Sequence, residues 1–121
     1  MKFEGNHEMP SLEFIEDEGR IKIWGRSIAM EIKLDFWQPL LDKLEDYLTD
    51  PRDITLILDF DYFNTPSAKE ILNVFKLIDK STSQNKRNFL IKWMYEDEDM
   101  LEAGEDFCSI VSSPTWKFIK K

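Results

Sequence analysis

The hydroxyl of Thr65 stands where a strand-like run gives way to a helix-like run. The apolar, β-rich residues 54–60 precede it, and Pro66 follows at a position that suits the first turn of a helix. Thr is a favoured N-cap, so a purely structural role as a helix cap is one interpretation. The other is phosphorylation, because a phosphate there would meet the free N–H groups and positive dipole end of a helix. The residues alone do not decide between the helix cap and the phosphorylation site.

Three neighbours of Thr65 would shape a site around it: Asn64, Ser67 and Lys69. Ser67 with Glu70 also offers a second register for the helix start, a capping box. Lys69 lies one turn into the predicted helix, where it could approach a phosphate, although an exposed helical lysine needs no ligand to explain it. In open α/β sheets, the carboxyl ends of strands are where ligands tend to bind.

The densest charge in the chain is the acidic run 96–106. On a helix, four of its carboxylates would share one face: Glu98, Glu102, Glu105 and Asp106. A hard cation such as Ca²⁺ prefers oxygen ligands, but the run lacks the EF-hand spacing and its glycine. We therefore predict no metal site and interpret this face either as solvated or as a surface that docks a partner.

Residues suited to covalent catalysis are scarce. His7 is the only histidine, and Cys108 is the only cysteine. Neither belongs to a recognisable Ser–His–Asp or Cys–His arrangement, and four glycines build no phosphate-binding loop. We expect no catalytic residue, no cofactor and no enzymatic activity. The lack of further histidines and of a nucleophile pair also counts against another hypothesis, a metal-dependent hydrolase built on the acidic run.

Composition narrows the class of partner. The chain has 121 residues, of which 42% are hydrophobic, and a net charge of −8. An acidic domain repels nucleic-acid phosphates and anionic membranes, so neither is expected as a partner. A single cysteine allows no internal disulfide, the N-terminus lacks an apolar signal region, and no apolar run approaches the roughly 20 residues that span a bilayer. We expect a cytoplasmic location.

Apolar periodicity predicts the elements that must position these residues. Alternation at 12–16 and 20–24, around an Asp-Glu-Gly turn, predicts an antiparallel hairpin. Further helices and strands then alternate along the chain: helices at 35–48 (capped by Asp35), 66–80 and 98–107, and strands at 54–60, 89–95 and 115–119.

Strands that alternate with helices favour parallel pairing and right-handed crossovers. We predict an α/β fold with a single mixed β-sheet, the antiparallel hairpin at one side, and about three helices on one face or both. The near-continuous apolar character of 54–60 predicts a central strand covered on both faces. A single domain is expected over 11–121, after a frayed segment 1–10.

Two segments, residues 62–69 and residues 93–107, resemble motifs of a known family, the SiaC family of bacterial regulatory phosphoproteins. Residues 62–69 (YFNTPSAK) are similar to its Leu/Phe-Asn-Thr-Ser-Ser-x-Lys motif. Residues 93–107 (WMYEDEDMLEAGEDF) are similar to its Trp-Tyr-Tyr strand and its acidic Asp-Met-Leu-Glu-x-Gly-Glu-Asp-Phe segment. The two motifs have a matching separation, and the resemblance covers roughly residues 10–120.

The resemblance implies a fold similar to STAS domains and a partner-switching cycle. A serine/threonine kinase would phosphorylate Thr65, and a PP2C-type phosphatase would reverse this. The unphosphorylated form would bind and activate a diguanylate cyclase, raise cyclic di-GMP and favour biofilm, with the acidic face as a docking surface. Pro66 departs from the Ser that is frequent in the family. The alternative is a constitutive interaction module of the same fold without phosphorylation.

Overall fold

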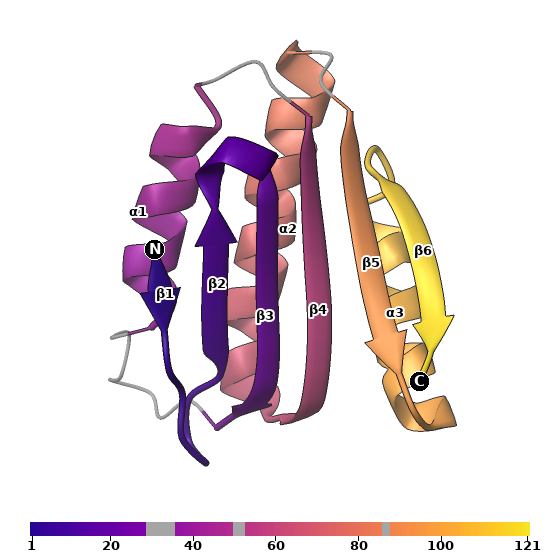
Figure 1. Cartoon of the computed structure of the whole chain (residues 1–121). Helices are drawn as coiled ribbons and strands as arrows, with labels where there is room; N and C mark the ends of the chain where they lie inside the picture. Colours follow the sequence, from indigo (N-terminus) through magenta and orange to yellow (C-terminus); the bar gives the residue numbers. More distant parts are fainter. Residues whose placement is uncertain (29–35, 50–52, 86–87) are drawn as a thin grey trace.

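The computed structural model describes residues 1–28, 36–49, 53–85 and 88–121. Within them, a six-stranded sheet holds its strands in chain order: β1 (Lys2–Phe3), β2 (Ser11–Ile15), β3 (Arg20–Ser27), β4 (Ile54–Phe63), β5 (Phe89–Tyr95) and β6 (Thr115–Lys120). The helices follow the strands β3, β4 and β5 in turn (Figure 1): α1 (Trp37–Tyr47), α2 (Thr65–Asn85) and α3 (Glu98–Ile110).

The strands pair in two modes. β1, β2 and β3 are antiparallel, whereas β3, β4, β5 and β6 are parallel. Each parallel strand is added beside the previous one in the same direction, so right-handed crossovers all pass over the same side of the sheet. Figure 1 shows α1, α2 and α3 together on that side. The predicted α/β fold, a mixed sheet with an N-terminal hairpin and three helices, is confirmed.

The hydrophobic core lies between the sheet and the helices. Side chains of β3, β4 and β5 that face the helices, such as Ile23, Leu58 and Trp93, are at most 2% exposed. Their neighbours that face the other way, such as Ile57 and Lys92, are only half-buried. The expectation that β4 is covered on both faces is therefore wrong. Within the described residues, no helix lies over its second face, which is flanked by side chains of the adjacent strands.

Several elements extend beyond their predicted ends. β4 continues to Phe63 through most of the expected loop, and α3 continues to Ile110. α2 begins at Thr65 and takes in the polar residues as far as Asn85. The Thr82 hydroxyl donates to the Ile78 carbonyl at 2.9 Å. That local bond lets a polar side chain continue the helix.

Residues 1–10, for which the sequence suggested a frayed segment, contribute β1. The Phe3 ring packs edge-on against Phe36, with centroids 5.6 Å apart, and this contact helps to hold the short strand against the fold. The expected cap Asp35 lies outside the described residues. In the described part of the chain, no helix is both long and apolar enough to cross a membrane.

Candidate functional site

Thr65 is the first residue of α2 and lies at the carboxyl ends of the parallel strands (Figure 1). β4 ends at Phe63, which pairs with Ser27 at the end of β3, and only Asn64 separates this strand end from the helix. The Thr65 side chain is exposed. Its place between a central strand and a helix N-terminus agrees with the sequence prediction, at the sheet edge where open α/β folds bind ligands.

The cap of α2 is Asn64 and not Thr65. The Asn64 Oδ1 accepts a hydrogen bond from the Ser67 N–H at 3.1 Å, and the Asn64 carbonyl accepts from the Ala68 N–H at 2.9 Å. This is the N-cap arrangement, so the capping interpretation of Thr65 is wrong by one residue. Among the residues that the structure describes, the Thr65 hydroxyl has no hydrogen-bond partner. It is therefore free of a capping role.

Ser67 is buried and ties α2 to the end of β3. Its Oγ donates to the Ser27 carbonyl at 2.9 Å, which leaves the Ser27 Oγ as donor in the 2.7 Å contact between the two hydroxyls. Ser67 is 0% exposed. It therefore shapes the site by fixing the helix start, out of reach of a ligand at the surface. The alternative capping box that begins at Ser67 is wrong, because this residue lies inside the helix.

The N-terminus of α2 would attract a phosphate through its helix dipole, but two of its backbone N–H positions cannot donate to one. Pro66 has no N–H, and the Ser67 N–H is already donated to Asn64. These two backbone groups are thus not available to a phosphate on Thr65, contrary to the sequence-based expectation. Lys69 is exposed and follows Thr65 by four residues on the same helix, so the two side chains share a face. Its ammonium therefore belongs to the helix face that would carry such a phosphate.

Phe63 connects the Thr65 turn to the acidic helix. The centroid of its ring lies 6.2 Å from that of Trp93 in β5 and 6.1 Å from that of Phe107 in α3. The two motif segments, 62–69 and 93–107, therefore meet in one aromatic cluster. Sequence reasoning placed each motif on its element but did not foresee this contact, because strand and helix periodicity carry no information about distant partners.

Gly104 lets α3 approach Trp93 closely. A Cβ at Gly104 would lie 2.5 Å from the Trp93 Cδ1 and Nε1, and the Trp93 Nε1 donates to the Met100 carbonyl at 2.9 Å. Asp97 caps the helix by accepting from the Met100 N–H at 2.9 Å. With the helix fixed in this way, its four candidate docking carboxylates are all exposed: Glu98, Glu102, Glu105 and Asp106.

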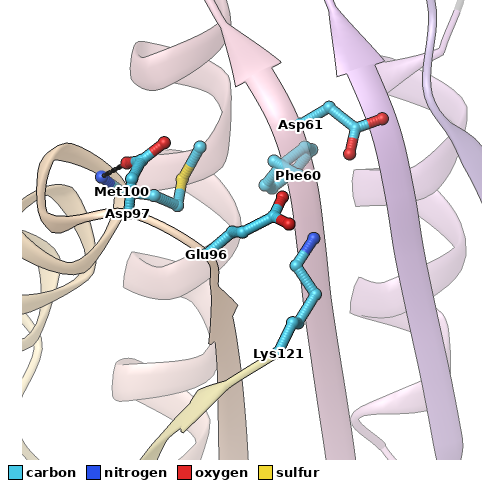
Figure 2. Close-up of a pocket in the computed structure, with 6 residues that line it drawn as sticks. All are labelled: Phe60, Asp61, Glu96, Asp97, Met100 and Lys121. Carbon is cyan, nitrogen blue, oxygen red and sulfur yellow. Dashed lines mark hydrogen bonds between the residues drawn. The ribbon is translucent and has the colours of Figure 1, made fainter.

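A small pocket of about 80 Å³ opens at the ends of β4 and β5 and the start of α3. Six residues line it (Figure 2): Phe60, Asp61, Glu96, Asp97, Met100 and Lys121. The Lys121 Nζ lies 2.7 Å from the Asp59 Oδ1, and this hydrogen bond raises the pKa of Lys121. Three lining carboxylates outnumber the one ammonium, so the pocket disfavours anionic ligands.

The remaining candidates for chemistry do not come together. Within the described ranges, no group of three or more His, Cys, Asp or Glu side chains is placed to hold a metal ion. Cys108 is half-buried. The pKa of its thiol is raised, mainly by burial and to a smaller extent by the negative charge of Glu105. A raised pKa disfavours the nucleophilic thiolate. His7 lies exposed in the segment between β1 and β2.

Comparisons with known proteins bear on the whole chain. The family model described as SiaC family regulatory phosphoprotein matches residues 3–121. A solved structure of diguanylate cyclase SiaD in complex with its activator SiaC, from Pseudomonas aeruginosa, is 22% identical, with a TM-score of 0.91 over 100% of this chain and 99% of that chain.

Apo-SiaC from the same organism is 21% identical, with a TM-score of 0.87 over 98% of this chain and 97% of that chain. At these identities the likeness of the solved structures shows the fold alone. No curated protein matches the sequence.

Proposed function

The chain belongs to the SiaC family of regulatory phosphoproteins, and from that membership we propose that it is a non-enzymatic, cytoplasmic partner-switching regulator. In this proposal a serine/threonine kinase phosphorylates Thr65, and a PP2C-type phosphatase removes the phosphate. The unphosphorylated chain binds and activates a diguanylate cyclase, which raises cyclic di-GMP and favours biofilm. The resemblance of residues 62–69 to the family motif supports Thr65 as the acceptor in this proposal.

The observation that carries the proposal is the state of the Thr65 hydroxyl. Asn64 takes over the cap, so an exposed Thr remains at the helix start without a structural bond among the described residues. Ser67, two residues away, is buried and hydrogen-bonded to Ser27, so its hydroxyl is not accessible to a kinase. The turn therefore presents Thr65 as its accessible hydroxyl.

Phosphorylation would change recognition and leave the fold in place. A phosphate adds a charge of about −1.5 to −2 at neutral pH. Lys69 on the same helix face and the dipole of α2 would stabilise it, while the exposed Asp61 of β4 would oppose further negative charge. The Ser27–Ser67 contact and the packing of Phe63 hold the turn from beneath. The expected effect is thus a change of surface charge on a rigid platform.

A diguanylate cyclase is the partner that the relatives support best. SiaC of Pseudomonas aeruginosa is the activator found in complex with diguanylate cyclase SiaD. In this chain the exposed carboxylates of α3 are the candidate docking residues, and Phe63 and Phe107 join their helix to the Thr65 turn. A charge added at Thr65 would therefore fall on the turn that packs, through Phe63, against the helix that carries the proposed docking residues.

The test combines phosphosite analysis with binding. Intact-mass and peptide mass spectrometry of the chain from its native cells should find phosphate on Thr65. The variants Thr65→Ala and Thr65→Asp are then compared with wild type for binding to the cognate cyclase and for cyclic di-GMP production. We expect Thr65→Ala to behave as wild type and Thr65→Asp to lose at least about tenfold in affinity.

Ser112→Asp is the matched control, because Ser112 is exposed in the connection between α3 and β6, and it should bind normally. Absence of phosphate under all growth conditions, together with unchanged binding by both Thr65 variants, contradicts the proposal. The alternative function, a constitutive interaction module of the same fold, predicts a partner that binds wild type and Thr65→Asp equally.

A further inference from the structure

One face of the sheet has no helix over it in the part of the chain that the structure describes, and we call it the open sheet face. In Figure 1 it is the side turned toward the viewer, with the helices behind. Alternate residues of β3, β4, β5 and β6 point to it, among them Lys22, Ile57, Lys92 and Lys117. The Thr65 turn lies at the edge of the sheet and not on this face.

Three lysines form a row across the open sheet face. The strand register pairs Lys22 with Ile57, Ile57 with Lys92, and Lys92 with Lys117. Neighbouring strands are about 4.8 Å apart, so Lys92 and Lys117 stand side by side, and Lys22 lies one strand beyond Ile57. Like charges directly opposite one another destabilise a sheet.

Glu13 of β2 stands opposite Lys22 in the strand register and is the carboxylate of the described residues that continues this row. Among residues 1–28, 36–49, 53–85 and 88–121, no carboxylate forms an ion pair with Lys22, Lys92 or Lys117. The whole chain nevertheless carries a net charge of −8. Lys92 and Lys117 have no carboxylate beside them in the register, so the described part of this face has a surface complementary to an anionic group.

The open sheet face is also partly apolar. Ile57, Leu90, Met94 and Ile119 lie on it and are half-buried, between the lysines. The Trp24 ring on the same face is occupied by Lys22, whose Nζ lies 5.3 Å from the ring centroid. The face therefore combines a row of positive charge with aliphatic contact area.

We propose that the open sheet face docks an acidic amphipathic segment of a partner protein. Carboxylates of the segment would pair with the lysine row, and its apolar side chains would cover Ile57 and Met94. Nucleic acid fits less well, because Trp24 is not free to stack on bases and the acidic remainder of the chain repels an extended polyanion. A membrane surface meets the same repulsion.

The proposal stands independently of Thr65. The lysine row belongs to the strands, whereas Thr65 belongs to the start of α2. The chain would thus have two contact surfaces, one that phosphorylation can alter and one of constant charge. A regulator with two such surfaces can hold one partner segment while the other contact switches.

The test uses the full chain and a synthetic helical peptide of about 15 residues with Leu on one face and Glu on the other. Fluorescence anisotropy should show binding that weakens as salt rises. The triple variant Lys22→Glu, Lys92→Glu and Lys117→Glu should lose at least about tenfold in affinity, and the corresponding Gln triple should lose less. Amide shifts in NMR should map to β3, β5 and β6.

The matched control reverses three exposed lysines that lie off this face, Lys76, Lys80 and Lys120, and it should bind within about twofold of wild type. The proposal is overturned if the peptide binds no better than a peptide in which every Glu is replaced by Gln. It is also overturned if the control variant loses as much affinity as the Lys→Glu triple variant. Binding of an RNA oligonucleotide or of phosphatidylglycerol vesicles in place of the peptide overturns it as well. Thr65→Ala should bind the peptide normally, so these outcomes leave phosphorylation of Thr65 a separate question.

Discussion

The hydroxyl oxygens of Ser27 and Ser67 lie 2.7 Å apart, in a buried contact between the end of β3 and the first turn of α2. The two residues are 40 positions apart in the sequence, and they are at most 1% exposed. This contact determines where the helix starts, and with it where Thr65 stands. A surface residue is thus positioned by a buried pair.

Loss of this pair should destabilise the chain. Ser67→Ala leaves the buried Ser27 hydroxyl without its partner, which should lower the free energy of unfolding by ~1–3 kcal/mol in urea denaturation. The double variant with Ser27→Ala should cost less than the sum of the single variants, because one interaction is counted twice. Ser83→Ala, at an exposed position of α2, serves as control. Strict additivity would contradict the contact.

Gly104→Ala should destabilise the chain although alanine is the better helix former. The new Cβ would lie 2.5 Å from Trp93, so α3 must move away from β5. We expect a loss of ~1–3 kcal/mol and a changed near-ultraviolet circular dichroism signal from Trp93. Glu102→Ala, on the exposed side of α3, should be close to neutral. A gain in stability for Gly104→Ala would show that the close approach is not limiting.

If Thr65 is phosphorylated, Lys69 should lower the second pKa of the phosphate. A nearby ammonium favours the dianion, so the second pKa of the phosphate should be lower in wild type than in Lys69→Gln. Titration followed by ³¹P NMR measures this directly. Lys76→Gln, farther along α2, is the control. Superimposable curves for wild type and Lys69→Gln would remove Lys69 from the site.

Lys92→Glu should stabilise the free protein. It replaces the side-by-side lysines at 92 and 117 with opposite charges on neighbouring strands. The expected gain is ~0.2–1 kcal/mol at low salt, and it should fade in about 1 M salt, where charges are screened. Lys76→Glu should give no such gain. A loss of stability would mean that packing of the Lys92 stem outweighs the repulsion.

Lys121→Met should reveal a pH-dependent contribution to stability. The pKa of Lys121 is raised above its ordinary value of 10.5 by its hydrogen bond to Asp59. A cation with a raised pKa stabilises the fold fully below the unfolded value and loses this effect as the pH rises through the folded value. The difference between wild type and Lys121→Met should therefore be constant near neutral pH and should shrink as the pH rises above 10.5, through the raised pKa of the folded state. Lys120→Met, at the neighbouring exposed position, is the control.

Local patterns predicted the elements well, because alternation and helical period are properties of neighbouring residues. β5 has the predicted bounds 89–95, and α3 begins at the predicted Glu98. The position of Thr65 between strand and helix followed from the same patterns. The identity of the cap did not, since Asn and Thr are both favoured caps and adjacent positions compete.

Contacts between residues that are far apart in the chain could not be predicted from the sequence. The contacts of Ser67 with Ser27 and of Phe63 with Phe107 join separate elements, and neither side chain carries a local sign of its partner. The placement of all helices on one face depends on the order in which strands enter the sheet. An apolar run such as β4 does not distinguish a second helical layer from close neighbouring strands.

The order of the strands has a consequence for how the chain folds. Because β1 to β6 follow one another in space as they do in sequence, no strand inserts between two that are already paired. Each strand that leaves the ribosome needs to find only its predecessor, across one short connection or one helix. Ser27 and Thr65 therefore lie on elements that leave the ribosome before α3 and β6. The Thr65 turn thus precedes the acidic helix α3 along the chain, and β6 is the last strand to join the sheet.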